Sequence, residues 1–252
     1  MDNTQYGMTT PLSIEIDSNK YRQSGEDFYG KIVRIAGSLK DSPDHFESFK
    51  DTLRHLRFLP AGRVQNAMGA ARQTTAFNCF VSGTIEDNMN SIMGRATEAA
   101  ETMRRGGGIG YDFSNLRPRG NRIKSLDSRA SGAVSFMQIY DAVCQTIASS
   151  GHRRGAQMGV LRIDHPDIEQ FITAKNDGTS LTGFNISVGV TDEFMKCLEK
   201  KEPFPLQFEG VVHEEVDPVA LWDMIMRSTW DWAEPGVLFI DTINKMNNLY
   251  YC

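Results

Sequence analysis

The chain has 252 residues and a formal charge of −5, with 27 Lys and Arg against 32 Asp and Glu. This charge argues against a nucleic-acid scaffold, and we expect no direct nucleic-acid binding, because such proteins carry a clustered excess of cations. No apolar run approaches the roughly 20 residues that cross a bilayer, and the first residues lack the pattern of a signal peptide. We therefore expect a globular, cytoplasmic protein without membrane contact.

Cysteine usage points away from structural metal or disulfide sites. The four cysteines lie far apart and form no CxxC pair, so we expect no metal site and no disulfide framework; they are Cys79, Cys144, Cys197 and Cys252. Cys79 lies in an apolar segment, where a lone cysteine is most often a small buried hydrophobic residue. Cys144 and Cys197 fit the same description, so the residues alone do not rank Cys79 above them.

The first sixty residues have a mainly helical pattern. Residues 1–20 show no hydrophobic period and favour a mobile arm or a lead-in strand. Apolar residues at three- and four-residue spacing predict one helix over 26–39 and a second over about 46–56. Residues 74–81 then predict a short buried strand.

Beyond residue 84 the pattern alternates between helices and strands. The most regular helix covers 89–103 and is followed by the Gly-rich segment Gly106–Gly110. The pattern then predicts a loop over 111–120, a helix over 133–149, a loop over 149–156, a strand over 158–163, a helix from Pro166 to about Lys175, a strand over 186–190, helices over 191–198 and 217–232, and a strand over 236–240. Such alternation indicates an α/β fold.

Two glycine motifs invite a nucleotide-binding interpretation. Gly25–Ile32 matches most of a phosphate loop, but Ile32 stands where Ser or Thr should hold magnesium, so we interpret it as a chance match. Gly106–Gly110 lacks the G-x-G-x-x-G spacing and follows a helix, whereas that fingerprint follows a strand. A tight turn is favoured there, but bare glycine backbone also lets a sugar or phosphate approach closely, so a ligand role stays open.

Arginines gather in the two loops that flank the helix predicted over 133–149. The first loop contains Arg117 and Arg119, and the second contains Arg153 and Gln157. Guanidinium groups bind phosphate in a bidentate fashion, and an amide side chain reads a base edge. A solvated surface loop is the alternative for the second loop, and the arginines of the first favour an anionic ligand.

Six segments stand out, in this order along the chain: Phe58–Arg63, Phe77–Phe80, Glu101–Gly110, Leu116–Gly120, Gly151–Gly159 and Trp232–Gly236. Together they resemble the large catalytic subunit of ribonucleotide reductase. No single segment is decisive, but the six together are highly specific. The resemblance covers the chain from about residue 55 onward.

The resemblance implies a fold and a division into domains. It implies a ten-stranded α/β barrel, with residues 1–57 as an N-terminal arm and helical region and residues 58–252 as the N-terminal portion of the barrel with its effector-specificity loops. The family's finger loop with its radical cysteine, its second redox cysteine and its later barrel strands have no counterpart in these 252 residues. We therefore expect the isolated chain to be inactive and to need a separate C-terminal portion.

The resemblance also implies a reaction and its residues. The family reduces ribonucleotides to deoxyribonucleotides for DNA synthesis by thiyl-radical chemistry. Cys79 matches a catalytic cysteine that supplies reducing electrons by closing a disulfide. Asn78 and the backbone of Gly107 and Gly108 match positions that line the substrate.

A second set of matches concerns allosteric effectors, which the resemblance implies to be deoxynucleoside triphosphates and ATP. Asp87 matches the residue that hydrogen-bonds the effector deoxyribose. The two Arg-containing loops match the specificity loops, so we assign effector binding to Arg117, Arg119, Arg153 and Gln157.

The motifs look closest to the adenosylcobalamin-dependent class II of the family, notably in Leu59–Arg63 and His152–Gln157. This implies adenosylcobalamin as a cofactor bound largely outside this chain. The implied partners are a ribonucleotide substrate, the C-terminal remainder of the enzyme, a second copy in a homodimer and a thioredoxin-type reductant. The alternative is a catalytically inactive nucleotide-binding or regulatory protein derived from the enzyme. A nicotinamide-dependent enzyme is disfavoured because the fingerprint spacing fails.

Overall fold

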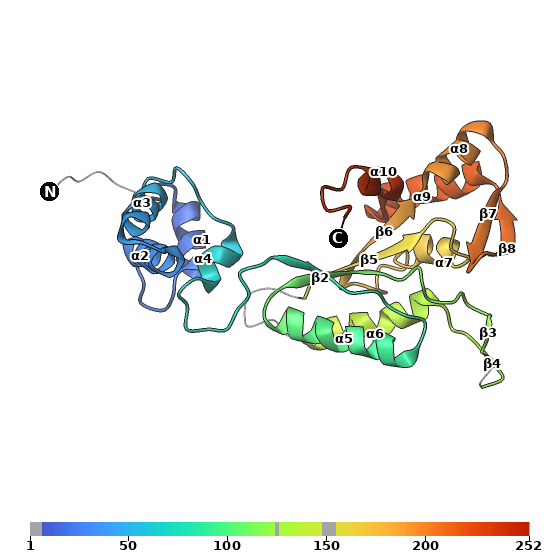
Figure 1. The fold of residues 1–252 in the computed structure, drawn as a ribbon, viewed down its shortest axis with the longest axis horizontal. Helices are drawn as coiled ribbons and strands as arrows, with labels where there is room; N and C mark the ends of the chain where they lie inside the picture. The colour runs from blue at the N-terminus through green and yellow to red at the C-terminus, as the bar shows by residue number, and fades with distance from the viewer. Residues whose placement is uncertain (1–6, 124–125, 148–154, 252) are drawn as a thin grey trace. The chain divides into compact units, whose positions relative to one another are not determined.

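The computed structural model describes residues 7–123, 126–147 and 155–251, which form two compact units. Unit 1 contains the described residues up to Asn78 together with Arg105–Gly107. Unit 2 contains Cys79–Arg104 and most of the chain from Gly108 onward (Figure 1). Unit 1 therefore extends past residue 57, and the domain boundary expected there stays a prediction.

Unit 1 is helical, as the pattern predicts. Its helices are α1 Pro11–Tyr21, α2 Phe28–Leu39, α3 Pro43–Arg54 and α4 Gly62–Ala67 (Figure 1). The expectation of an arm or strand over residues 1–20 is wrong for α1. This helix begins with a capping box, in which the Thr10 side chain accepts from the Ser13 backbone N–H at 3.3 Å and the Ser13 side chain accepts from the Thr10 backbone N–H at 3.2 Å. Pro11 occupies its first turn, where a missing N–H costs nothing.

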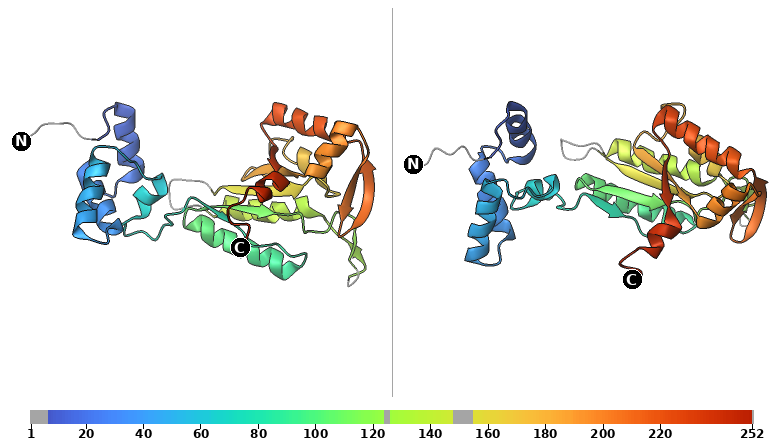
Figure 2. Two further views of the ribbon diagram at one scale, coloured as in Figure 1. Left: turned by 45° about the horizontal axis from the view of Figure 1, so that its top comes forward. Right: turned by 90° about the horizontal axis from the view of Figure 1, so that it is seen from above.

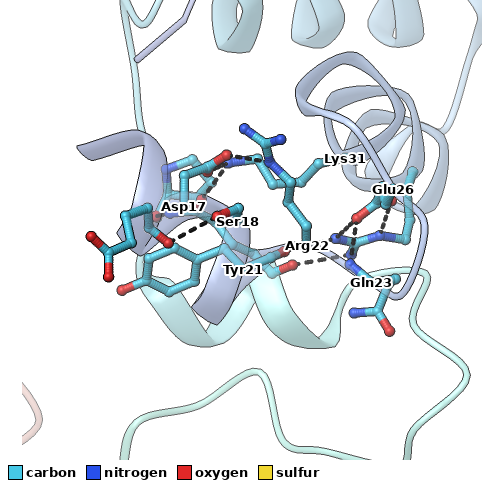
Figure 3. Close-up of polar contacts among 11 residues, drawn as sticks. Asp17, Ser18, Tyr21, Arg22, Gln23, Glu26 and Lys31 are labelled. Carbon is cyan, nitrogen blue, oxygen red and sulfur yellow. Dashed lines mark hydrogen bonds and ion pairs between the residues drawn. The ribbon is translucent and has the colours of Figure 1, made fainter. Parts of the chain in front are cut away.

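A buried charge cluster holds α1 against the rest of unit 1 (Figure 3). The only buried residue of α1 is Asp17, which pairs with the buried Lys31 of α2 and accepts a bond from Arg22 Nε at 2.7 Å. Lys31 also donates to Gln65 Oε1 at 3.2 Å. A buried, paired Lys31 fits the interpretation of the Gly25–Ile32 motif as a chance match.

Unit 2 is built on a five-stranded, wholly parallel sheet in the order β1-β2-β5-β6-β9. Its strands are β1 Cys79–Val81, β2 Gly108–Asp112, β5 Gln157–Arg162, β6 Phe184–Val190 and β9 Gly236–Phe239. Along the chain, each new strand of the sheet is added next to the preceding one and always at the same edge. Right-handed connections therefore place the intervening helices on one face of the sheet. The α/β class is thus confirmed, whereas closure into a ten-stranded barrel stays a prediction.

Helices and short hairpins complete unit 2. The helices are α5 Met89–Arg104, α6 Ala133–Thr146, α7 Ile168–Thr173, α8 Asp192–Lys200, α9 Pro218–Trp232 and α10 Ile240–Lys245. The hairpins are β3 Arg122–Ile123 with β4 Ser128–Arg129, and β7 Phe204–Phe208 with β8 Val211–Val216. Helices α5 and α6 lie side by side (Figure 2). One continuous cluster of buried residues joins them to the sheet.

Two expectations about strands are wrong. The strand expected over 74–81 is limited to Cys79–Val81 and is exposed, because β1 is an edge strand with a neighbour on one side only. The loop expected over 111–120 begins two residues later. Tyr111 and Asp112 extend β2, since they pair with Gly159 and Val160 of β5.

Candidate functional site

The Cys79 thiol lies on the face of the sheet that the helices leave open. Cys79 pairs with Gly108 of β2, and register partners in a parallel sheet share a face. Ile109 and Tyr111 of β2 are buried under the helices, so Gly108, which directly precedes Ile109, faces the opposite side of the sheet. Cys79 is exposed, which excludes the role of a buried core residue within the described chain.

Cys79 and Gly108 are the first residues of their strands, so the pair lies at one end of the sheet. Gly108 has no side chain to cover its backbone beside the thiol, and Asn78 and Gly107 directly precede the two paired residues along the chain. Cys144, in contrast, is buried on α6, and burial raises the pKa of its thiol. Among the described cysteines, Cys79 is the one with an exposed thiol.

The opposite end of the sheet brings the predicted effector residues together. Asp87 follows β1 and Arg117 follows β2, so both lie at the carboxyl ends of neighbouring parallel strands, where α/β sheets commonly bind ligands. Arg117 Nε–H donates to Asp87 Oδ2, and the Arg117 backbone N–H donates to Asp87 Oδ1 at 3.3 Å. The acceptor expected for a sugar hydroxyl and the cation expected for phosphates are thus in direct contact.

The Asp87–Arg117 pair borders an open cavity of about 670 Å³ between the two hairpins. It is lined by Asp87, Arg117, Asn121, Arg122, Ile123, Phe208, Glu209, Val211 and His213. A neighbouring cavity of about 600 Å³ shares Asp87, Phe208 and Glu209 with it and is lined further by polar and charged side chains, among them Ser114, Asn115, Arg162 and Asp164. Both hairpins, β3–β4 and β7–β8, lie at this end of unit 2 (Figure 1). We call the first of these cavities the anion cavity, because Arg117 and Arg122 line it.

Buried contacts fix the loop that carries Arg117. His165 Nε2 contacts the Leu116 carbonyl oxygen at 2.8 Å, and His165 Nδ1 accepts from the Asp167 N–H at 3.0 Å. With Nδ1 accepting, Nε2 is the protonated donor of a neutral imidazole. Burial lowers the pKa of His165, which favours this neutral form. Asp167 in turn accepts from the backbone N–H of Arg119 at 3.0 Å.

The remaining predicted effector residues have different surroundings. The Arg119 side chain is exposed and does not line either cavity. Arg153 lies outside the described residues. Gln157 is 3 % exposed and lies in the core, where Tyr111 Oη donates to its Oε1 at 2.8 Å and its Nε2 donates to the Tyr140 carbonyl oxygen at 3.0 Å.

Sequence reasoning missed part of the anion cavity. Arg122 follows Arg117 and Arg119 closely along the chain, at the start of β3, so the charge pattern alone was sufficient to include it. Phe208 and His213 come from a hairpin some ninety residues later, and no local pattern connects them with Asp87. Within the described chain, no cluster of three or more His, Cys, Asp or Glu side chains is arranged to hold a metal ion. No described helix is long and apolar enough to span a membrane.

The fold and site thus define an α/β protein with a parallel sheet, an exposed cysteine at one end of the sheet and a cavity lined by arginines and carboxylates at the other. The family model described as "Ribonucleotide reductase, barrel domain" matches residues 77–252. The match covers more than half of the chain, which therefore belongs to the ribonucleotide reductase barrel-domain family. The resemblance drawn from the six sequence segments is confirmed.

Relatives and a solved structure agree with this assignment. The vitamin B12-dependent ribonucleoside-diphosphate reductase of Mycobacterium tuberculosis (strain ATCC 25618 / H37Rv) is 41% identical over 204 residues, covering 80% of this chain and 29% of the relative. The protein of the same name from Thermoplasma acidophilum is 36% identical, covering 81% of this chain and 27% of the relative. The class Id α subunit of Actinobacillus ureae shares the fold, with a TM-score of 0.78 and 21% identity over 94% of this chain and 41% of that chain. The chain thus spans less than a third of the length of these two curated relatives.

Proposed function

We propose that this chain supplies the effector-binding site and one redox-active cysteine of a ribonucleotide reductase. The observation that carries the proposal is the meeting of Asp87 and Arg117 at the anion cavity, from positions 30 residues apart. A carboxylate is suited to accept a deoxyribose hydroxyl, and Arg117 and Arg122 are suited to bind a triphosphate. Deoxynucleoside triphosphates and ATP are therefore the proposed effectors.

The proposed chemical role of Cys79 follows from its exposure on the open face. Two thiols give up two electrons and two protons as they form a disulfide, and the ribose takes these up as its 2′-hydroxyl leaves as water. In the proposed thiyl-radical mechanism, Cys79 is one of these two thiols, and the second comes from outside the described residues. Gly107, Gly108 and Asn78 line the ribonucleotide. A regulatory protein without catalysis is the alternative, but such a protein needs no exposed thiol beside a glycine backbone.

The relatives named above are described as vitamin B12-dependent, so adenosylcobalamin is the proposed source of the radical. The two cavities described here, of about 670 and 600 Å³, carry carboxylates, arginines and amides, with Phe208 in both and Ile123 and Val211 in the anion cavity. A corrin with its side chains and nucleotide loop is larger than either cavity, so neither cavity fits the cofactor. We therefore assign the cofactor no residue of this chain and derive no step through it.

The proposed partners follow from the exposed surfaces and the length of the relatives. Met89 and Met93 of α5 are exposed beside the anion cavity's end of the sheet, which suits a homodimer contact along α5. The chain spans less than a third of its relatives, so turnover is proposed to need further parts of the enzyme and a thioredoxin-type reductant. Arg153 is proposed to relay the effector's identity, so Arg153→Ala should alter substrate preference more than effector affinity.

Calorimetric titration tests the effector site on the 252-residue chain directly. Magnesium complexes of the four deoxynucleoside triphosphates and of ATP are titrated into the wild-type chain and into Arg117→Ala and Arg122→Ala variants. Saturable binding that both variants weaken supports the proposal. Binding that neither variant changes, or the absence of binding at millimolar nucleotide, refutes the site.

A further inference from the structure

The side chain of Gln157 is the centre of a buried hydrogen-bond network that joins four elements of unit 2. On one side its Oε1 accepts from Tyr111 of β2 at 2.8 Å. On the other its Nε2 donates to the carbonyl oxygen of Tyr140 of α6 at 3.0 Å. Tyr140 Oη then donates to the Ile92 carbonyl oxygen of α5 at 2.7 Å. The Tyr140 carbonyl oxygen can only accept, so the Gln157 nitrogen faces it and the Gln157 oxygen faces the Tyr111 hydroxyl.

The network is buried and rigidly packed. Tyr111 and Tyr140 are each at most 3 % exposed, and their rings meet edge to face with centroids 4.9 Å apart. Burial raises the pKa of the Tyr140 hydroxyl to about 12, so it stays protonated and remains a donor. Leaving any of these polar groups unpaired in the core is costly, which resists independent movement of the four elements.

The network runs between the two functional ends of the sheet. Ile92 is in the first turn of α5, the helix that begins two residues after Asp87. Tyr111 is on β2, three residues after Gly108, the partner of Cys79. Gln157 is the first residue of β5, whereas the anion cavity lies beyond the last residues of the strands. Five strand steps separate those ends by roughly 16 Å, so Gln157 does not reach a nucleotide in the anion cavity of its own chain.

We infer that Gln157 is a positioning residue. With Tyr111 and Tyr140 it fixes the position of β2 relative to α5, and β2 in turn pairs with β1, the strand that carries Cys79. Nucleotide binding at Asp87 therefore alters the surroundings of the Cys79 thiol. This inference rests on the proposed effector site and replaces a direct contact between Gln157 and the effector. Packed and hydrogen-bonded groups carry coupling between two sites when they have two discrete arrangements, and the experiment below measures whether this network does so.

The test compares Tyr111→Phe, Gln157→Met and the double variant with wild type. Tyr111→Phe removes one hydroxyl and keeps the packed ring. Ser228→Ala is the matched control, because it removes another buried hydroxyl of unit 2, which bonds the Ile172 carbonyl oxygen at 3.1 Å outside the network. Two quantities are measured: the Kd of magnesium dATP by calorimetry, and the rate of Cys79 alkylation by iodoacetamide, resolved by peptide mass spectrometry with and without the nucleotide.

In wild type and the control, dATP should change the Cys79 alkylation rate by about 5-fold or more, the lower end of typical coupling between sites. The two network variants and their combination should lose this change to the same extent and keep the wild-type Kd. The inference is overturned if Gln157→Met weakens binding while Tyr111→Phe does not, or if both variants respond like the control. If the wild-type chain binds no dATP, the proposed effector site is refuted. The positioning role of Gln157 is then tested by the Cys79 alkylation rate without nucleotide. This rate must shift equally in the three network variants and stay unchanged in the control.

Discussion

The Asp87 carboxylate accepts both the backbone N–H and the guanidinium N–H of Arg117 at the carboxyl edge of the parallel sheet. The ion pair is partly buried, with side-chain exposures of 23% and 32%. It prepares the site, since each group is held at the cavity before a nucleotide arrives. It also opposes binding, because a triphosphate must compete with Asp87 for the guanidinium.

Replacing Asp87 separates these two effects. If the carboxylate accepts a deoxyribose hydroxyl, Asp87→Ala should weaken binding of a deoxynucleoside triphosphate by about 1.5–3 kcal/mol, the range for a hydrogen bond to a charged group. Calorimetric titration measures this, with Glu98→Ala as the control for loss of an exposed carboxylate on α5. Tighter binding by Asp87→Ala would mean that releasing Arg117 from its ion pair outweighs the loss of the carboxylate. It would refute the assignment of Asp87 as acceptor for the deoxyribose hydroxyl.

The contrast between Cys79 and Cys144 gives a second prediction. Cys79 is exposed, whereas Cys144 is buried and burial raises the pKa of its thiol. Since the thiolate is the reactive form, iodoacetamide at pH about 8 should label Cys79 much faster than Cys144, as peptide mass spectrometry resolves. In an active enzyme, Cys79→Ser should abolish multiple turnover, and Cys144→Ser should leave it nearly intact. Equal losses in the two variants would contradict a reductant role specific to Cys79.

The neutral His165 predicts a pH-dependent stability. Its folded-state pKa is lowered from 6.5 by burial, so the unfolded chain takes up a proton at a higher pH than the folded chain. The stability that neutral His165 contributes is complete above pH about 6.5 and is lost as the pH falls toward the folded-state pKa. His165→Gln retains one donor and one acceptor but does not titrate. Urea unfolding between pH about 5.5 and 7.5 should therefore show a smaller pH dependence in His165→Gln. Since all other histidines are common to both proteins, identical slopes would exclude this role for His165.

Elements determined by regular apolar spacing were predicted from the sequence, whereas elements determined by distant polar contacts were not. The helices α2 and α5 and the strand β6 follow regular apolar patterns and lie within a few residues of their expected bounds. Helix α1 was missed because its one buried residue is Asp17, so the helix carries no apolar stripe. Its start was nevertheless readable in Thr10 and Pro11.

The residues of the candidate site show the same contrast between local sequence patterns and distant contacts. Cys79, Asp87 and Arg117 come from segments that resemble the family, and the pairing of Asp87 with Arg117 joins residues from two neighbouring strand ends. The core position of Gln157 was not predictable, because an amide after an arginine-rich loop has the same local pattern whether it points outward or inward. Its partners Tyr111 and Tyr140 are 46 and 17 residues away, and only the folded sheet brings them together.

Unit 1 allows a stability prediction that depends on which member of a buried ion pair is removed (Figure 3). Asp17 and Lys31 are 1 % and 2 % exposed, so each needs its partner. Removing Asp17 leaves the Lys31 ammonium with Gln65 as its neutral partner. Removing Lys31 leaves the Asp17 carboxylate still paired with Arg22. Asp17→Ala should therefore lower the free energy of unfolding of unit 1 by about 3–5 kcal/mol, the typical cost of breaking a buried pair. Lys31→Met should lower it distinctly less.

Hydrogen exchange measured on peptides from α1 and α2 reports this loss, and peptides from β5 and β6 of unit 2 serve as the internal reference. A larger loss for Lys31→Met, or equal losses for the two variants, would show that Arg22 does not compensate the Asp17 charge.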